Sequence, residues 1–96
     1  MSKIMAKIVK ASGEIVDISP KNRKDFQLDE VQQIVGGYVE AIRINDEEFM
    51  LVDEEGKLNA KPINVKATAY YCANKRNACN DFIVGDVLLC STSEFL

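Results

Sequence analysis

The side chains that could do chemistry in this chain are carboxylates, lysines and thiols, because the sequence contains no histidine. Histidine is the commonest general base, completes the Ser-His and Cys-His nucleophile pairs, and is the usual nitrogen ligand of zinc. The sequence also has no glycine-rich phosphate-loop pattern. We therefore expect a protein that is not an enzyme, with no catalytic residue, no cofactor and no metal site.

Three cysteines, Cys72, Cys79 and Cys90, are the only thiols. Six residues separate Cys72 from Cys79, which does not fit the short ligand pairs of structural zinc. We expect reduced thiols, as in a cytosolic protein. Lys75 and Arg76 lie between the first two cysteines and could lower a thiol pKa, so a redox-sensing Cys79 is a further hypothesis.

The charge balance is weakly acidic, with 15 acidic and 12 basic residues and a net charge of −3. Such a domain lacks the broad basic surface of a nucleic-acid binder. Tyr70 and Tyr71 beside Lys75 and Arg76 could form a stacking and charged surface for a nucleotide or a single strand, but core and rim packing of the tyrosines is the favoured interpretation. A nucleic-acid module would also need five basic residues to meet on one face: Lys21, Arg23, Lys24, Lys75 and Arg76.

The acidic runs "NDEE" and "DEEG" are typical of exposed turns, so we interpret their carboxylates as solvated. Gly56 lies at the bend of the second turn, and "DEEG" lacks the length and alternating oxygen ligands of a calcium loop. A small enzyme that uses carboxylate or thiol chemistry stays an alternative.

Hydrophobic periodicity predicts the elements that must position these groups. Short Ile/Val-rich runs separated by turn residues indicate antiparallel strands, and an i, i+3, i+7 pattern from Leu28 to Val35 indicates a helix. Either Gln27 or Asp25 caps that helix, and Phe26 and Val31 occupy the positions of a hydrophobic staple. The predicted strands cover 3–10, 13–19, 38–44, 48–52 and 81–91, and the predicted helices cover 28–36 and 64–73.

Residues 63–73 are ambiguous, since their apolar residues fit both a helical stripe and a strand-like alternation. We favour a helix because alanines are frequent and Asn64 is a good N-cap. "FMLV" (49–52) has no polar interruption, which predicts a central strand buried on both faces. Gly85 marks a turn or bulge within the last strand.

These elements predict a single α+β domain over residues 1–96, with a roughly five-stranded, mainly antiparallel sheet packed by two helices. No signal-peptide pattern and no apolar run long enough to span a membrane occur, so we expect a cytoplasmic chain. Homodimerisation through an exposed sheet edge fits this architecture.

The adjacent glycines of "IVGGY" suggest two alternatives, a ligand-binding loop or the C-cap of a helix. Glycines that follow a helix expose carbonyl groups at the negative end of its dipole, which argues against anion binding and favours the cap. If a ligand or partner surface does exist in this chain, we expect it where the predicted helix ends and the next predicted strand begins. Its candidate residues are Gly36, Gly37, Tyr38, Asn64 and Tyr70.

The segment "KDFQLDEVQQIVGGYVEAI" resembles the signature of a family of small proteins of unknown function from Firmicutes, their phages and mobile elements. The family pattern is Q-x-I-V-G-G-Y-I-E, and residues 33–38 and Glu40 fit it, with Val39 in place of isoleucine. Gln27 stands where the family has serine. Weaker similarity continues through "EEGK", Asn64 with Ala67-Thr68, and "IVGDVLL", so the resemblance covers about Asp25 to Leu89.

The resemblance implies an origin and a context but no reaction and no site residues. Together with the missing histidine and the small size, it favours an accessory protein that binds a host protein or a small ligand. An inhibitor or a ligand-sequestering protein is one concrete form of this hypothesis.

Overall fold

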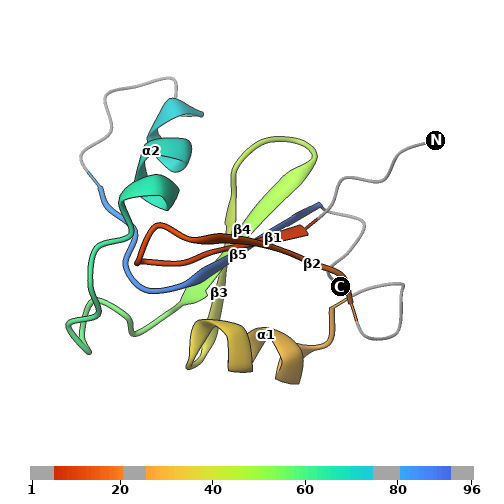
Figure 1. The fold of residues 1–96 in the computed structure, drawn as a ribbon, viewed down its shortest axis with the longest axis horizontal. Helices are drawn as coiled ribbons and strands as arrows, with labels where there is room; N and C mark the ends of the chain where they lie inside the picture. Colours follow the sequence, from red (N-terminus) through yellow and green to blue (C-terminus); the bar gives the residue numbers. More distant parts are fainter. Residues whose placement is uncertain (1–5, 21–25, 75–80, 92–96) are drawn as a thin grey trace.

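The computed structural model describes residues 6–20, 26–74 and 81–91. Five strands form one antiparallel sheet in the order β2-β1-β5-β4-β3, with two helices packed on it (Figure 1). The predicted α+β class is therefore confirmed. The elements are β1 (Ala6–Val9), β2 (Ile15–Ile18), α1 (Leu28–Val35), β3 (Val39–Arg43), β4 (Glu48–Asp53), α2 (Val65–Ala73) and β5 (Val87–Ser91).

The two helices lie on opposite faces of the sheet, with α1 below it and α2 above one end of it in Figure 1. Two separate buried clusters match this arrangement, because side chains alternate between the faces of a strand. In β4, Leu51 packs with α1, whereas Met50 and Val52 belong to the cluster that includes Ala67 of α2. We call these two sides the α1 face and the α2 face.

Strand β4 is buried on both faces, as the uninterrupted apolar run predicted: Met50, Leu51 and Val52 are all buried. It lies inside the sheet between β3 and β5. The centre of the sheet is β5, which joins the β1–β2 hairpin to the β3–β4 hairpin. Strand β5 thus holds the two hairpins together in one sheet.

Both helices begin near their predicted starts. Gln27 is the N-cap of α1, and the Glu30 carboxylate accepts a hydrogen bond from the Gln27 backbone N–H at 3.1 Å. Phe26 and Val31 are both buried in the same cluster, which agrees with a hydrophobic staple. Asn64 is the N-cap of α2, so the ambiguous segment is helical.

Three expectations need correction. The predicted strand 81–91 is too long, since β5 covers only Val87–Ser91. Before β5, Val84 forms an isolated bridge to Ile63, and the positive φ of Gly85, 74°, interrupts the extended backbone. The "DEEG" turn is not uniformly exposed, since Asp53 and Gly56 are buried. A Cβ on Gly56 would lie 2.8 Å from Cγ2 of Val84, so the turn packs inward.

The third correction concerns the cysteines. Cys72, near the end of α2, is disulfide-bonded, although reduced thiols were expected. We expected reduced thiols because the cytosol is a reducing compartment. Whether a disulfide can form also depends on how closely the fold brings two sulfur atoms together, which the sequence does not show. Cys90 is buried and forms no disulfide, and Cys79 lies outside the described residues.

Candidate functional site

The glycine pair of "IVGGY" ends α1 and packs against an ion pair whose carboxylate is buried. Gly36 is the C-cap, with a left-handed φ of 80° and its N–H donating to the carbonyl of Gln32 at 2.8 Å. The Lys61 ammonium donates to the carbonyl of Val35 at 2.7 Å. A cation at this position satisfies a helix-end carbonyl and interacts favourably with the negative end of the helix dipole.

Lys61 is held there by Asp53, the last residue of β4. Its Nζ lies 2.6 Å from Oδ2 of Asp53, and the Asp53 side chain is 2 % exposed. Burial raises the pKa of Asp53, but the Lys61 ammonium and the Glu55 N–H hold the pKa of this carboxyl below its usual 3.8. Asp53 is thus ionised at neutral pH.

Gly37 lets the Asp53 carboxylate approach the chain. A Cβ at Gly37 would lie 2.7 Å from Oδ1 and 2.8 Å from Oδ2 of Asp53, closer than any real contact. Gly36 and Gly85 border Lys61 in the same way, with added Cβ atoms 3.1 Å from its Nζ and 2.9 Å from its Cδ. These three glycines therefore lie directly against the Asp53–Lys61 ion pair.

Asn64 is a structural residue with every polar group of its side chain satisfied. It is fully buried, and its amide N–H groups donate to the carbonyls of Val9 at 2.7 Å and Gly85 at 2.8 Å. Its Oδ1 accepts from the backbone N–H of Ala67 at 3.0 Å. This amide joins β1, the turn before β5 and α2, and it has no donor left for a ligand.

The two candidate tyrosines lie apart from each other. Tyr38 is exposed beside the end of α1, and its carbonyl accepts from the Glu54 N–H at 2.7 Å. The Tyr70 hydroxyl donates to Glu48, and this hydrogen bond raises the pKa of Tyr70 to about 12. Glu48 and Asp53 are at opposite ends of β4, roughly 16 Å apart at about 3.3 Å per residue. The five candidates therefore do not form one site.

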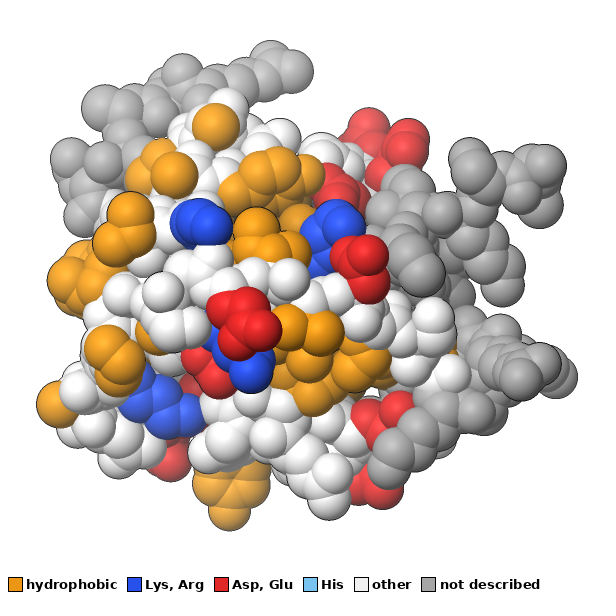
Figure 2. Space-filling view, in the orientation of Figure 1, with side chains coloured by type: hydrophobic (Ala, Val, Ile, Leu, Met, Phe, Trp, Pro, Cys, Tyr) orange, Lys and Arg blue, Asp and Glu red, His pale blue; other side chains and the backbone are white. Residues whose placement is uncertain are grey.

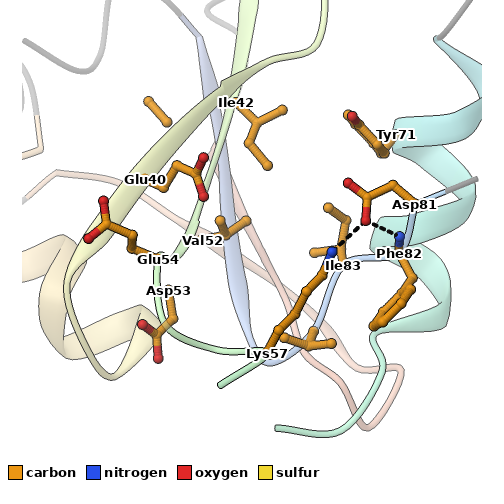
Figure 3. Close-up of a pocket in the computed structure, with 12 residues that line it drawn as sticks. Glu40, Ile42, Val52, Asp53, Glu54, Lys57, Tyr71, Asp81, Phe82 and Ile83 are labelled. Carbon is orange, nitrogen blue, oxygen red and sulfur yellow. Dashed lines mark hydrogen bonds and ion pairs between the residues drawn. The ribbon is translucent and has the colours of Figure 1, made fainter. Parts of the chain in front are cut away.

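A pocket of about 380 Å³ lies on the α2 face, between β3, β4 and the segment before β5. Its apolar lining comes from Ile42, Val52, Ile83 and Val84, and aromatic side chains stand at Tyr71 and Phe82 (Figure 3). Asp53 also borders the pocket, but its side chain points away, toward Lys61 on the other face.

Charged groups surround this apolar lining. Glu40 and Glu54 lie together on one side of the pocket, and Lys57 and Asp81 lie on the other (Figure 3). Lys57 forms an ion pair with Asp81, and its ammonium lies 4.4 Å above the centre of the Phe82 ring. Figure 2 shows one face of the molecule, where acidic and basic side chains are interspersed among apolar ones.

Glu40 and Glu54 have no ion-pair partner among residues 6–20, 26–74 and 81–91. They are diagonal neighbours on adjacent strands, because Glu40 pairs with Val52 while the Glu54 N–H bonds to Tyr38. Like charges so placed repel one another. A cation bound beside the two carboxylates would relieve this repulsion.

Sequence reasoning missed all of the charged residues of the pocket: Glu40, Glu54, Lys57 and Asp81. Glu40 was noted only as part of the family pattern, and Glu54 was assigned to a solvated turn. Glu40 and Ile42 are two positions apart in one predicted strand, which indicates that their side chains lie on the same face of the sheet. No signal in the sequence brings residues 81–84 opposite that strand.

Some other expectations touch this site. Within the described ranges, no group of three metal-ligating side chains occurs. The described helices also include none long and apolar enough to cross a membrane. The basic residues of the nucleic-acid alternative, Lys21, Arg23, Lys24, Lys75 and Arg76, lie outside the described residues.

The fold and the pocket define a small α+β protein with one helix on each face of an antiparallel sheet and a charged pocket on one of them. The chain belongs to the family described as domain of unknown function DUF3846, whose model matches residues 4–95. No curated protein and no solved structure matches the chain.

Proposed function

We propose that this protein is a non-enzymatic accessory protein, of phage or mobile-element type, that binds a positively charged group in the pocket on the α2 face. The group belongs to a host protein or to a small ligand. The observation that carries this proposal is the pair of carboxylates, Glu40 and Glu54, that border an apolar and aromatic pocket and have no ion-pair partner among the described residues.

The charge of the pocket favours a cation. Apart from Asp53, which pairs with Lys61, the charged residues that line the pocket are three carboxylates, Glu40, Glu54 and Asp81, and one ammonium, Lys57, which gives a net charge of −2. Aromatic faces such as Phe82 add a cation–π attraction, already used by Lys57. A planar guanidinium suits this site best, because it can bond to a carboxylate through two N–H groups and stack on a ring.

The expected affinity for a single side chain is weak. Each exposed ion pair contributes about 0.2–1 kcal/mol, and contact with the apolar lining adds a similar amount per group. Binding of roughly 4 kcal/mol corresponds to a Kd on the order of 1 mM. An inhibitor or sequestering protein would gain further affinity from contacts outside the pocket.

Titration calorimetry with N-acetyl-arginine methylamide tests this proposal. The matched neutral probe is the citrulline analogue, which keeps the shape and removes the charge. We expect the arginine probe to bind about tenfold more tightly than the citrulline probe and to lose that preference in Glu40→Gln and Glu54→Gln. Glu47→Gln, which removes the same charge from the β3–β4 turn, should bind like the wild type.

Two results would overturn the proposal. Equal affinity of the two probes would show that charge does not determine binding. Chemical conversion of the arginine probe, followed by mass spectrometry, would show an enzyme and would favour the carboxylate-chemistry alternative.

A further inference from the structure

We infer, on the basis of the proposed function, that the cationic group is carried by an extended segment of a partner protein, which adds to the sheet as an antiparallel strand beside β3. The segment pairs with the free edge of β3 through its backbone. A basic side chain of the segment enters the pocket on the α2 face.

The hydrogen bonds of β3 determine which of its backbone groups face outward. The carbonyl of Tyr38 accepts from the Glu54 N–H at 2.7 Å, and the Ile44 N–H donates to the carbonyl of Glu48 at 3.0 Å. In an antiparallel pair, hydrogen-bonded and non-hydrogen-bonded positions alternate. Residues 38, 40, 42 and 44 therefore bond to β4, and the N–H and C=O groups of residues 39, 41 and 43 point away from it.

This edge has no strand beside it in the described part of the chain, since β3 is the last strand in the sheet order. Val39, Ala41 and Arg43 thus present three N–H groups and three carbonyl groups in a row. Such a row is a template for another strand. Recognition by strand addition takes its affinity from these groups and its specificity from alternate side chains.

The pocket opens next to the same edge. Glu40, Ala41 and Ile42 of β3 all line it, and the alternation of side chains places Glu40 and Ile42 on the pocket side. Side chains directly opposite each other on neighbouring strands have Cβ atoms about 4.5–5.5 Å apart. A basic side chain opposite Glu40 or Ile42 is therefore within reach of the pocket.

The other edge of the sheet lacks this complementarity. On the β1–β2 hairpin, Asp17 lies 2.6 Å from the ammonium of Lys7, and Glu14 lies 3.5 Å from that of Lys10. The carboxylates near β2 are thus already paired. The unpaired carboxylates Glu40 and Glu54 lie at the β3 edge, which favours this edge for a basic partner.

A second copy of the chain fits the β3 edge less well. In a symmetric antiparallel pair centred on Ala41, Glu40 would face Ile42 of the other copy and Arg43 would face Val39. Arg43 lies on the α1 face, so it would not reach Glu40. Charge complementarity therefore favours a different, basic segment over a homodimer.

The test uses the peptide acetyl-Thr-Arg-Val-Arg-Val-Arg-Thr-amide with the full-length protein and follows amide hydrogen exchange by NMR. At saturation we expect the amide protons of Val39, Ala41 and Arg43 to exchange at least about tenfold more slowly than in the free protein. Those of Glu40 and Ile42, already bonded to β4, should change much less. The peptide should also bind at least about tenfold more tightly than N-acetyl-arginine methylamide.

N-methylated peptides supply the matched controls. In antiparallel pairing, the N–H groups of the valines point toward β3 and those of the arginines point away. N-methylation of the valines should therefore weaken binding about tenfold or more, whereas N-methylation of the arginines should have little effect. Arg43→Pro, which removes an outward N–H at an edge residue outside the pocket lining, should weaken peptide binding and leave binding of the arginine probe unchanged.

The outcomes separate this inference from the proposed function. If the peptide binds no more tightly than the arginine probe and protects no edge amide, strand addition is wrong and the pocket proposal stands. If neither the peptide nor the probe binds, both fail. Protection of Val39, Ala41 and Arg43 in the free protein, with a dimer mass in ultracentrifugation, would assign the edge to a second copy and overturn the inference.

Discussion

The substitution Gly37→Ala should destabilise the fold because of the carboxylate that Gly37 faces. The added Cβ would lie 2.7–2.9 Å from three atoms of Asp53. The carboxylate cannot turn away freely, since Lys61 holds one oxygen at 2.6 Å and the Glu55 N–H holds the other at 2.9 Å. Overpacking of this kind typically costs about 1–3 kcal/mol.

A double-mutant cycle with Asp53→Ala isolates the clash. The φ of Gly37 is not positive, so alanine carries no backbone strain there. In the Asp53→Ala background, Gly37→Ala should be neutral or stabilising by about 0.4–1 kcal/mol, because alanine reduces the entropy of the unfolded chain. The coupling energy between the two positions is then about 1–4 kcal/mol.

Urea denaturation followed by circular dichroism measures the four free energies of unfolding. Gly13→Ala is the control, since Gly13 has a positive φ of 98° and its Cβ would meet only Lys66, at 4.0 Å. Its cost should be the same with and without Asp53. A Gly37→Ala cost that is also unchanged by Asp53→Ala would show that the cost does not come from contact with this carboxylate.

Three further predictions follow from individual side chains. Asn64→Ala should lower the free energy of unfolding by about 2–4 kcal/mol, because three buried hydrogen bonds are lost, and Asn64→Asp should recover only the cap; urea denaturation checks both. The pKa of Tyr70, raised to about 12, predicts stability that is lost as the pH rises through that value, and Glu48→Gln should shift the ultraviolet titration of Tyr70 downward. The lowered pKa of Asp53 predicts stability that is full above 3.8 and is lost as the pH falls through the folded-state pKa. Asp53→Asn should abolish that part of the acid dependence.

Much of the fold could be predicted from the sequence because its signals are local. The apolar run 49–52 predicts an interior strand, the spacing from Leu28 to Val35 predicts α1, and Asn64 predicts the start of α2. The order of the strands depends on contacts between distant segments, such as β5 with β1 and β4. Local periodicity carries no information about such pairing.

The buried character of Asp53 was not predictable for a related reason. "DEEG" has the composition of a solvated turn, and nothing in its neighbours indicates that Lys61 folds back over it. The glycine pair was correctly assigned to the end of a helix, and the structure adds what the second glycine does. Gly36 provides the left-handed cap, whereas Gly37 provides space for Asp53.

The candidate site was harder to predict from the sequence than the fold. Gly36, Gly37, Tyr38, Asn64 and Tyr70 were selected because glycines, amides and tyrosines often contact ligands, but here the glycines and Asn64 serve the fold. The pocket is formed by β3, β4 and residues 81–84, and the last segment lies about 30–40 positions after the two strands in the sequence. Its charged residues come together only through the sheet.

We propose that the α2-face pocket, and not the glycine pair, is the binding site. An NMR titration of the isotope-labelled protein with N-acetyl-arginine methylamide tests this claim most directly. We predict that the amide shifts of Glu40, Ile42 and Phe82 change with the probe while those of Gly36 and Gly37 do not. Shift changes confined to Gly36 and Gly37 would contradict the account.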